Sequence, residues 1–131
     1  MLRLYKFVES CLPNTYKNVT YESMDEDKPD QVGIFHFESE ADKETMEGTL
    51  WENLKFQIQV TAEVNETNLE KIPDYLRGFI KIIESRFDSG DDTLEIIECK
   101  HEGPKALKLR TNDYNIAIWR CVINIKYNLE E

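Results

Sequence analysis

The chain has 131 residues, a size for which one hydrophobic core is sufficient. Its 40% hydrophobic and 32% charged residues are typical of a globular protein and not of a disordered one. No apolar run approaches the roughly 20 residues that span a bilayer, and the first twelve residues are amphipathic. We therefore expect a single domain, residues 1–131, that is made and kept in a cytoplasm and has no membrane partner.

The net charge of −10 is unevenly distributed along the chain. Residues 22–52 carry eleven acids against two lysines, whereas residues 100–126 carry six cations against two acids. Binding of nucleic acid through a basic face requires concentrated lysine and arginine, so this composition argues against it. A chain with one acidic and one basic region can instead meet its own copies head to tail.

The first half of the chain predicts one helix, two strands and a loop. The helix covers residues 2–12 and ends at Pro13. Its apolar residues recur on one helical face: Leu4, Phe7, Val8, Cys11 and Leu12. A short β-prone stretch at 19–23 and a strand at 31–38 follow. Residues 38–50 have no apolar periodicity, which predicts a long mobile hairpin loop.

The middle of the chain contains the strongest periodic signals. Strict alternation of apolar and polar residues over 54–64 predicts a half-buried antiparallel strand. The period then changes to that of a helix over about 68–87. Thr67 and Glu70 have the spacing of a capping box. Pro73 allows two starts: a helix that begins near Thr67 and bends, or a single turn followed by a helix with Pro73 in its first turn.

Three strands complete the predicted fold. Strands at 94–100 and 105–110 are separated by a turn at 101–104, and a two-residue hairpin turn at 112–113 leads into a long strand at 116–129. The order α-β-β-β-α-β-β-β, with hairpin connections, predicts an α+β fold. We expect a mainly antiparallel sheet with the N-terminal and central helices packed on it.

Few residues have the spacing that catalysis or metal binding requires. His36 and His101 each have an acid nearby, but a lone histidine on a strand is more often a surface or core residue than a base. There is neither a glycine-rich phosphate loop nor a nucleophile elbow. Cys11, Cys99 and Cys121 suit buried reduced thiols better than a disulfide framework or a zinc site. We expect no enzyme, cofactor or metal, although an active site built from distant residues stays possible.

Four aromatic residues lie near predicted loops and strand ends: Phe35, Phe37, Trp51 and Tyr114. Such residues either close the core or anchor an interface, where tryptophan and tyrosine are enriched. The pattern leaves both interpretations open.

The order of elements and the ending of the chain resemble a known family. The matching features are the N-terminal amphipathic helix, the strand at 32–37, the long loop, and the alternating strand that leads into a helix. The closing sequence GPKALKLRTNDYNIAIWRCVINIKYNLEE supplies a Gly-Pro turn, a short strand, a polar turn and a long final strand. In these respects the chain resembles the tail-terminator and minor-capsid proteins of the head–tail junction in long-tailed bacteriophages.

The resemblance implies a structural virion protein. Such a protein forms a homo-oligomeric ring, commonly of six copies, that caps the tail tube, stops its polymerisation and docks onto the head connector. It is assembled in the host cytoplasm, DNA only passes through its channel, and neither a cofactor nor catalytic residues are implied. A head-completion protein (stopper or adaptor) of the same connector is an alternative. A small intracellular enzyme or ligand-binding α+β domain is an alternative of another class.

The uneven charge suggests how copies of the chain could join. The candidate interface residues are Glu40, Asp42, Glu44, Glu47, Trp51, Lys105, Lys108 and Arg110. In a ring, the acidic stretch of one subunit would lie near the basic residues of the next, where opposite charge steers association. Two alternatives remain: the acids could line the channel and repel passing DNA, or the loop could simply be solvated.

Overall fold

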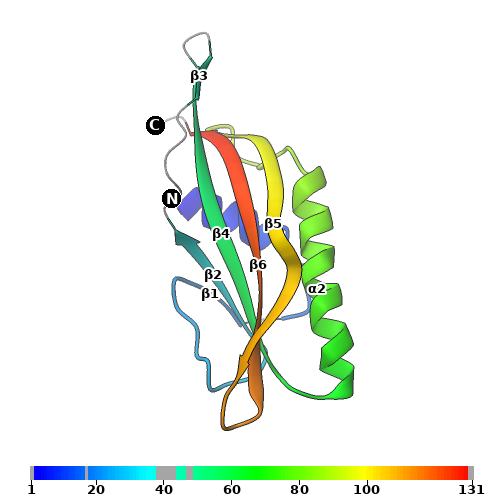
Figure 1. Cartoon of the computed structure of the whole chain (residues 1–131). Helices are drawn as coiled ribbons and strands as arrows, with labels where there is room; N and C mark the ends of the chain where they lie inside the picture. Colours follow the sequence, from blue (N-terminus) through cyan, green and yellow to red (C-terminus); the bar gives the residue numbers. More distant parts are fainter. Residues whose placement is uncertain (1, 17, 38–43, 47–48, 130–131) are drawn as a thin grey trace.

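A computed structural model of the chain describes residues 2–16, 18–37, 44–46 and 49–129. The elements in chain order are α1 (Leu2–Ser10), β1 (Asn18–Tyr21), β2 (Gln31–Phe37), β3 (Glu44–Met46), β4 (Thr49–Glu63), α2 (Glu66–Ser85), β5 (Leu94–Thr111) and β6 (Ile116–Leu129) (Figure 1). The main sheet has the order β1-β2-β4-β6-β5, and β3 pairs with β4 off this path. β1 and β2 run parallel, while the other pairs are antiparallel. The predicted α+β class with a mainly antiparallel sheet is therefore confirmed.

One face of the sheet carries the hydrophobic core. From Leu54 to Val60 on β4, buried residues alternate with half-buried ones, as the period-two pattern predicts. The apolar stripes of α1 and α2 pack against this face in one cluster that contains Phe7, Ile58 and Phe79, each at most 2% exposed. Figure 1 shows α2 running beside β5 and α1 crossing the sheet. Among the described residues no helix covers the opposite face of the sheet, which we call the open face.

Helix α2 is continuous and begins earlier than predicted. Asn65 caps it, because the Asn65 side-chain oxygen accepts a hydrogen bond from the backbone N–H of Asn68 at 2.8 Å. The Asn68 side chain in turn donates to the carbonyl of Glu63. The predicted capping box at Thr67 is therefore corrected to a cap two residues upstream. Pro73 lies inside the helix and does not end it.

Strand β5 corrects the prediction of two strands separated by a turn at 101–104. It runs without reversal from Leu94 to Thr111. The pairing with β6 advances from Glu102 to Leu107 on β5 while β6 advances only from Val122 to Arg120, so the extra residues form a bulge. Gly103 adopts a positive φ of 69° in this bulge. The Gly-Pro pair suits an edge strand, where proline's missing donor costs no ladder hydrogen bond.

The connection between β5 and β6 also differs from the predicted two-residue turn. Four residues, 112–115, link the strands. The Asn112 side-chain oxygen accepts hydrogen bonds from the backbone N–H groups of Tyr114 and Ile116, and Asn115 adopts a positive φ of 61°. Asparagine tolerates the left-handed region and readily forms such side-chain turns, which explains the longer loop.

The predicted mobile loop at 38–50 lies partly outside the described residues. In its described part, β3 pairs with the first residues of β4, so that Glu44 faces Trp51 and Met46 faces Thr49 in the ladder. Figure 1 shows this hairpin projecting beyond the end of the main sheet. Strand β4 is consequently longer than the predicted strand at 54–64, and the mobility of the segment stays a prediction.

Candidate functional site

The open face is formed by the residues of β2, β4, β6 and β5 that alternate with the core residues. Its members include Phe35, Phe37, Lys55, Gln57, Gln59, Glu102, Leu107, Arg120, Val122 and Asn124. Most of them are half-buried, because neighbouring side chains shield one another. Phe37, at the end of β2, is 41% exposed. The face therefore combines apolar surface with polar groups that have no helix above them among the described residues.

A hollow of about 350 Å³ lies on this face, and we call it the central hollow. Its apolar wall consists of Phe37, Pro104, Leu107 and Val122. Lys55, Gln57, Glu102 and Arg120 supply its polar groups. The Lys55 ammonium on β4 binds the Glu102 carboxylate on β5 at 2.9 Å, so this ion pair reaches across β6.

Arg120 is the cation of the central hollow for which no partner is found among the described residues. Its register neighbours are Gln59 on β4 and Leu107 on β5. The Gln59 side chain donates a hydrogen bond to Gln57 at 2.6 Å and is thereby engaged with its own strand. Residue Arg120 is half-buried, and within the described residues no carboxylate or other hydrogen-bonding partner contacts its guanidinium.

Gly33 leaves room for the Phe35 ring on the open face. A Cβ atom at position 33 would lie 2.6 Å from the Phe35 ring and 3.1 Å from the Cβ of Met24. The ring therefore occupies the space that any other residue would need at position 33. Sequence reasoning did not single out this glycine, since the contact joins residues whose arrangement only the sheet defines.

The acidic loop, residues 22–30, folds over the other end of the open face and is anchored by Thr61. The Thr61 hydroxyl donates to the Lys28 carbonyl at 2.7 Å and accepts from the backbone N–H of Gln31 at 3.0 Å. The backbone carbonyl of Thr61 also accepts from Asp30. Thr61 is the polar residue that is buried among the residues the structure describes. These hydrogen bonds satisfy its hydroxyl and its backbone carbonyl.

The acidic loop also contacts the β5–β6 hairpin. Arg110 donates to the Glu26 carboxylate at 2.9 Å, and the Asn112 side chain donates to the Glu26 carbonyl at 3.2 Å. A second hollow of about 300 Å³ lies here, lined by Glu26, Asp27, Arg110, Asn112, Asp113, Ile116 and Ile118. The acidic and basic stretches of the sequence therefore meet within one chain at this point.

The structure separates the predicted interface residues. Glu40, Asp42 and Glu47 lie outside the described residues. Glu44 and Trp51 are ladder partners in the β3–β4 hairpin, at the opposite end of the sheet from the β5–β6 hairpin (Figure 1). Among the described candidates, Glu44 and Trp51 thus lie far from the basic residues near the β5–β6 hairpin.

The three basic candidates differ in their surroundings. Lys105 and Lys108 are exposed on the outer half of β5. Lys108 faces Trp119 in the ladder and therefore shares the helix-side face, whereas Arg110 binds Glu26 beside the open face. The structure does not bring these three cations together into one basic patch.

Both histidines are engaged by carboxylates, and His36 also contacts aromatic rings. The backbone N–H of His36 and the Tyr5 hydroxyl both donate to Glu22 at 2.8 Å, and the Tyr5 hydroxyl also contacts the His36 ring. Burial and the Glu22 carboxylate raise the pKa of Tyr5 above its ordinary value. His101 lies 3.1 Å from the Glu84 carboxylate, which joins β5 to α2. These contacts bind helices to the sheet.

All three cysteines are free and buried, as the sequence predicts. Burial raises the pKa of Cys99 and of Cys121 to about 12. Both thiols are consequently protonated at neutral pH, and a protonated thiol is a poor nucleophile.

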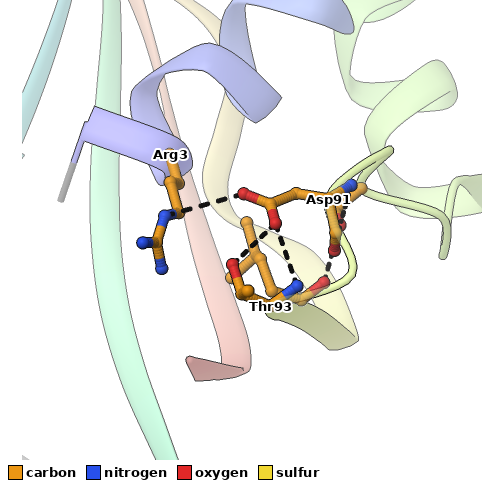
Figure 2. A network of polar contacts seen from close by, with 5 residues as sticks. Arg3, Asp91 and Thr93 are labelled. Carbon is orange, nitrogen blue, oxygen red and sulfur yellow. Dashed lines mark hydrogen bonds and ion pairs between the residues drawn. The ribbon is translucent and has the colours of Figure 1, made fainter. Parts of the chain in front are cut away.

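The loop that precedes β5 is organised by Asp91. Figure 2 shows the Asp91 carboxylate receiving hydrogen bonds from the Thr93 hydroxyl and backbone N–H, at 2.6 and 2.9 Å. The Arg3 guanidinium approaches the same carboxylate at 3.7 Å and ties α1 to this loop (Figure 2). The Thr93 hydrogen bonds, with a smaller contribution from Arg3, lower the pKa of Asp91. These contacts account for the conformation of the loop before β5 without a bound ligand.

Neither metal-binding clusters nor membrane helices occur in the part of the chain that the structure describes. There, no group of three or more histidine, cysteine or acidic side chains is arranged to hold a metal ion. Likewise, none of the described helices combines the length and apolarity needed to cross a bilayer. Comparisons of the sequence with protein-family models and with curated proteins found no match.

Proposed function

We propose that this chain is a non-enzymatic structural subunit that assembles with copies of itself and with other proteins. The observation that carries the proposal is the open face, where the partly apolar central hollow, the exposed Phe37 and Arg120 lie together. Exposed apolar surface rimmed by polar groups is typical of protein–protein contacts. Tyr114, 71% exposed at the β5–β6 hairpin, adds a second aromatic group suited to an interface.

Within this class we propose a tail terminator of a long-tailed bacteriophage. The support is the N-terminal helix, the long alternating strand β4 that leads into α2, and the closing hairpin of β5 and β6. The Gly-Pro turn of the resemblance is instead a bulge within β5. The chain would form a ring, commonly of six copies, at the head–tail interface of the virion. There it would cap the tail tube, stop tube polymerisation and join the tube to the head connector, while DNA only passes through the channel.

The role at the tube end is tested with the tail tube protein encoded in the same genome. Tube polymerisation is followed by negative-stain electron microscopy with and without the purified chain. We expect tubes that carry a ring at one end and stop growing, because a bound ring removes the surface to which the next tube subunit adds. Unchanged tube lengths with bare ends would contradict the terminator role. Binding to the isolated connector in place of the tube would favour the head-completion alternative.

A further inference from the structure

We propose that the free edge of β5 over residues 103–111, which we call the basic edge, binds an acidic, extended segment of another protein as an added strand. The inference rests on the proposed assembly with other proteins and specifies the chemistry of one partner. It differs from the pairing between copies that the sequence suggests, because the occupant is a strand of a different protein and the contact lies at the edge of the sheet.

The first argument is the open backbone of the basic edge. β5 is the last strand of the sheet, and along its first half the Glu84 carboxylate of α2 accepts a hydrogen bond from the backbone N–H of His101 at 3.2 Å. Beyond this point Figure 1 shows β5 diverging from α2. Among the described residues, no hydrogen bond joins the backbone of 103–111 to any element other than β6. Such an edge is a template for pairing with another chain.

The second argument is the charge of the basic edge, which carries three cations and no acid. Lys105 and Lys108 are exposed, and neither forms an ion pair with a carboxylate of the described chain, whereas Arg110 binds Glu26. Lys108 lies on the helix side of the strand and Arg110 beside the open face. An added strand also presents side chains on both faces of the sheet, so its acids can reach cations on either face.

The basic edge also sets the length and the apolar content of its occupant. The strand stays extended as far as Thr111, although its register with β6 shifts. Pro104 has no backbone N–H to donate, and the turn at 112–115 ends the edge, so the occupant is a segment of about seven residues. Leu107 is half-buried and Leu109 is 39% exposed, so apolar residues among the acids of the partner would find a contact.

The cations of the basic edge also reject other strands. Like charges opposite each other destabilise a strand pair, so the basic edge of a second copy would be repelled. Lysines on an edge likewise discourage pairing with neutral, apolar strands. The β1 edge of a second copy, Asn18–Tyr21, carries no acid, and its acidic loop is anchored by Thr61 and Arg110. An acidic strand of another protein is the occupant that these surfaces favour.

The chain's own residues 38–43 are too short a link to reach the basic edge. They are held beside β4 at both ends, by Phe37 and Glu44. Leu107 lies three strands from β2, roughly 14 Å across the sheet, and roughly 13 Å further along it. A path from Phe37 to Leu107 and on to Glu44 is therefore roughly 45 Å long, whereas six residues span at most about 25 Å. The two residues after β6 follow the partner of Leu94, at the opposite end of β5.

The test measures binding of a labelled peptide by fluorescence anisotropy. The probe has four glutamates and four valines in alternating pairs, so that both faces of the extended peptide carry acids. A neutral counterpart has glutamine in place of glutamate. We expect the wild type to bind the acidic peptide about tenfold more tightly than the neutral one at low salt, where screening is weakest.

Two double variants assign the binding to the basic edge. Lys105→Gln with Lys108→Gln, the edge variant, should bind the acidic peptide about tenfold more weakly than the wild type. Arg77→Gln with Lys81→Gln removes the same charge from exposed positions on α2 and should bind like the wild type. Circular dichroism checks that each variant is folded, which is expected because all four side chains are exposed.

Hydrogen exchange of the wild type separates an added strand from a contact between charges alone. An added strand forms hydrogen bonds with the outward-facing amides of 105–111, so their exchange should slow about tenfold or more with saturating acidic peptide. The amide of His101 already binds Glu84 and should exchange at an unchanged rate. A peptide methylated at backbone nitrogens on both edges cannot extend the sheet and should bind about tenfold more weakly.

Several outcomes overturn the inference. Equal binding of the acidic and neutral peptides would do so, as would an edge variant that binds like the wild type. Peptide binding with unchanged exchange over 105–111 would show a charge contact without an added strand. Self-association that the edge variant abolishes would identify a second copy as the occupant. A peptide that fails to bind while tubes still acquire rings removes this contact and leaves the proposed function intact, whereas peptide binding with bare, unchanged tubes removes the terminator role alone.

Discussion

Ile58→Asp is expected to unfold the domain or leave it barely stable. Ile58 lies in the centre of β4, is 0% exposed, and faces Ile34 and Cys121 across the neighbouring strands. A carboxylate there loses its hydration, and no cation lies among these ladder partners to compensate it. We expect a loss of about 4 kcal/mol or more in unfolding free energy. Domains of this kind have only about 5–15 kcal/mol in total, so little stability would remain.

Urea denaturation followed by circular dichroism measures the effect of Ile58→Asp. Gln59→Asp is the matched control, because position 59 is on the open face of the same strand and neighbours Arg120 in the ladder. The control should change the unfolding free energy by less than about 1.5 kcal/mol. Equal losses in the two variants would show that the inward and outward faces of β4 are assigned incorrectly.

Phe79→Ala is expected to have the next largest effect, because Phe79 joins α2 to the sheet. It is 0% exposed and belongs to the same cluster as Phe7 and Ile58. Removing a buried phenyl ring costs its transfer free energy and leaves a cavity, together about 3–5 kcal/mol. Thermal and urea denaturation should both show this loss.

Phe87→Ala is the control for the phenylalanine experiment. Phe87 follows the end of α2 and is 62% exposed, so its removal should leave the unfolding free energy within about 0.5 kcal/mol of the wild type. A small effect of Phe79→Ala, or a similar effect of both substitutions, would contradict the packing of α2 described above.

The parts of the fold that the sequence predicts are those set by local periodicity. The alternation along 54–64 and 116–129 predicts strands and also which side chains face the core, because the β period is two. The same alternation places Arg120 on the other face of the sheet from Trp119 and Cys121. In the structure this is the open face. The local pattern therefore predicts the face of the sheet on which Arg120 lies. It does not predict which contacts Arg120 makes there.

The features that the sequence misses depend on contacts between distant residues. The Gly-Pro pair at 103–104 signals a turn and a bulge equally well, and pairing with β6 decides between them. Thr61 reads as one polar residue in an alternating strand, yet its hydroxyl anchors the acidic loop through Lys28. Likewise, Glu26 and Arg110 are 84 residues apart in the chain, so their ion pair has no local signal.

The central claim is that the chain assembles into a closed ring of its own copies. The direct measurement is the mass of the purified wild-type chain, by native mass spectrometry and by sedimentation equilibrium over a wide concentration range. The account predicts one closed species, six times the 15.5 kDa subunit if the ring has the size common in the family it resembles. A heterologous contact that closes produces such a discrete species. A 15.5 kDa monomer at every concentration, in both methods, would contradict the claim.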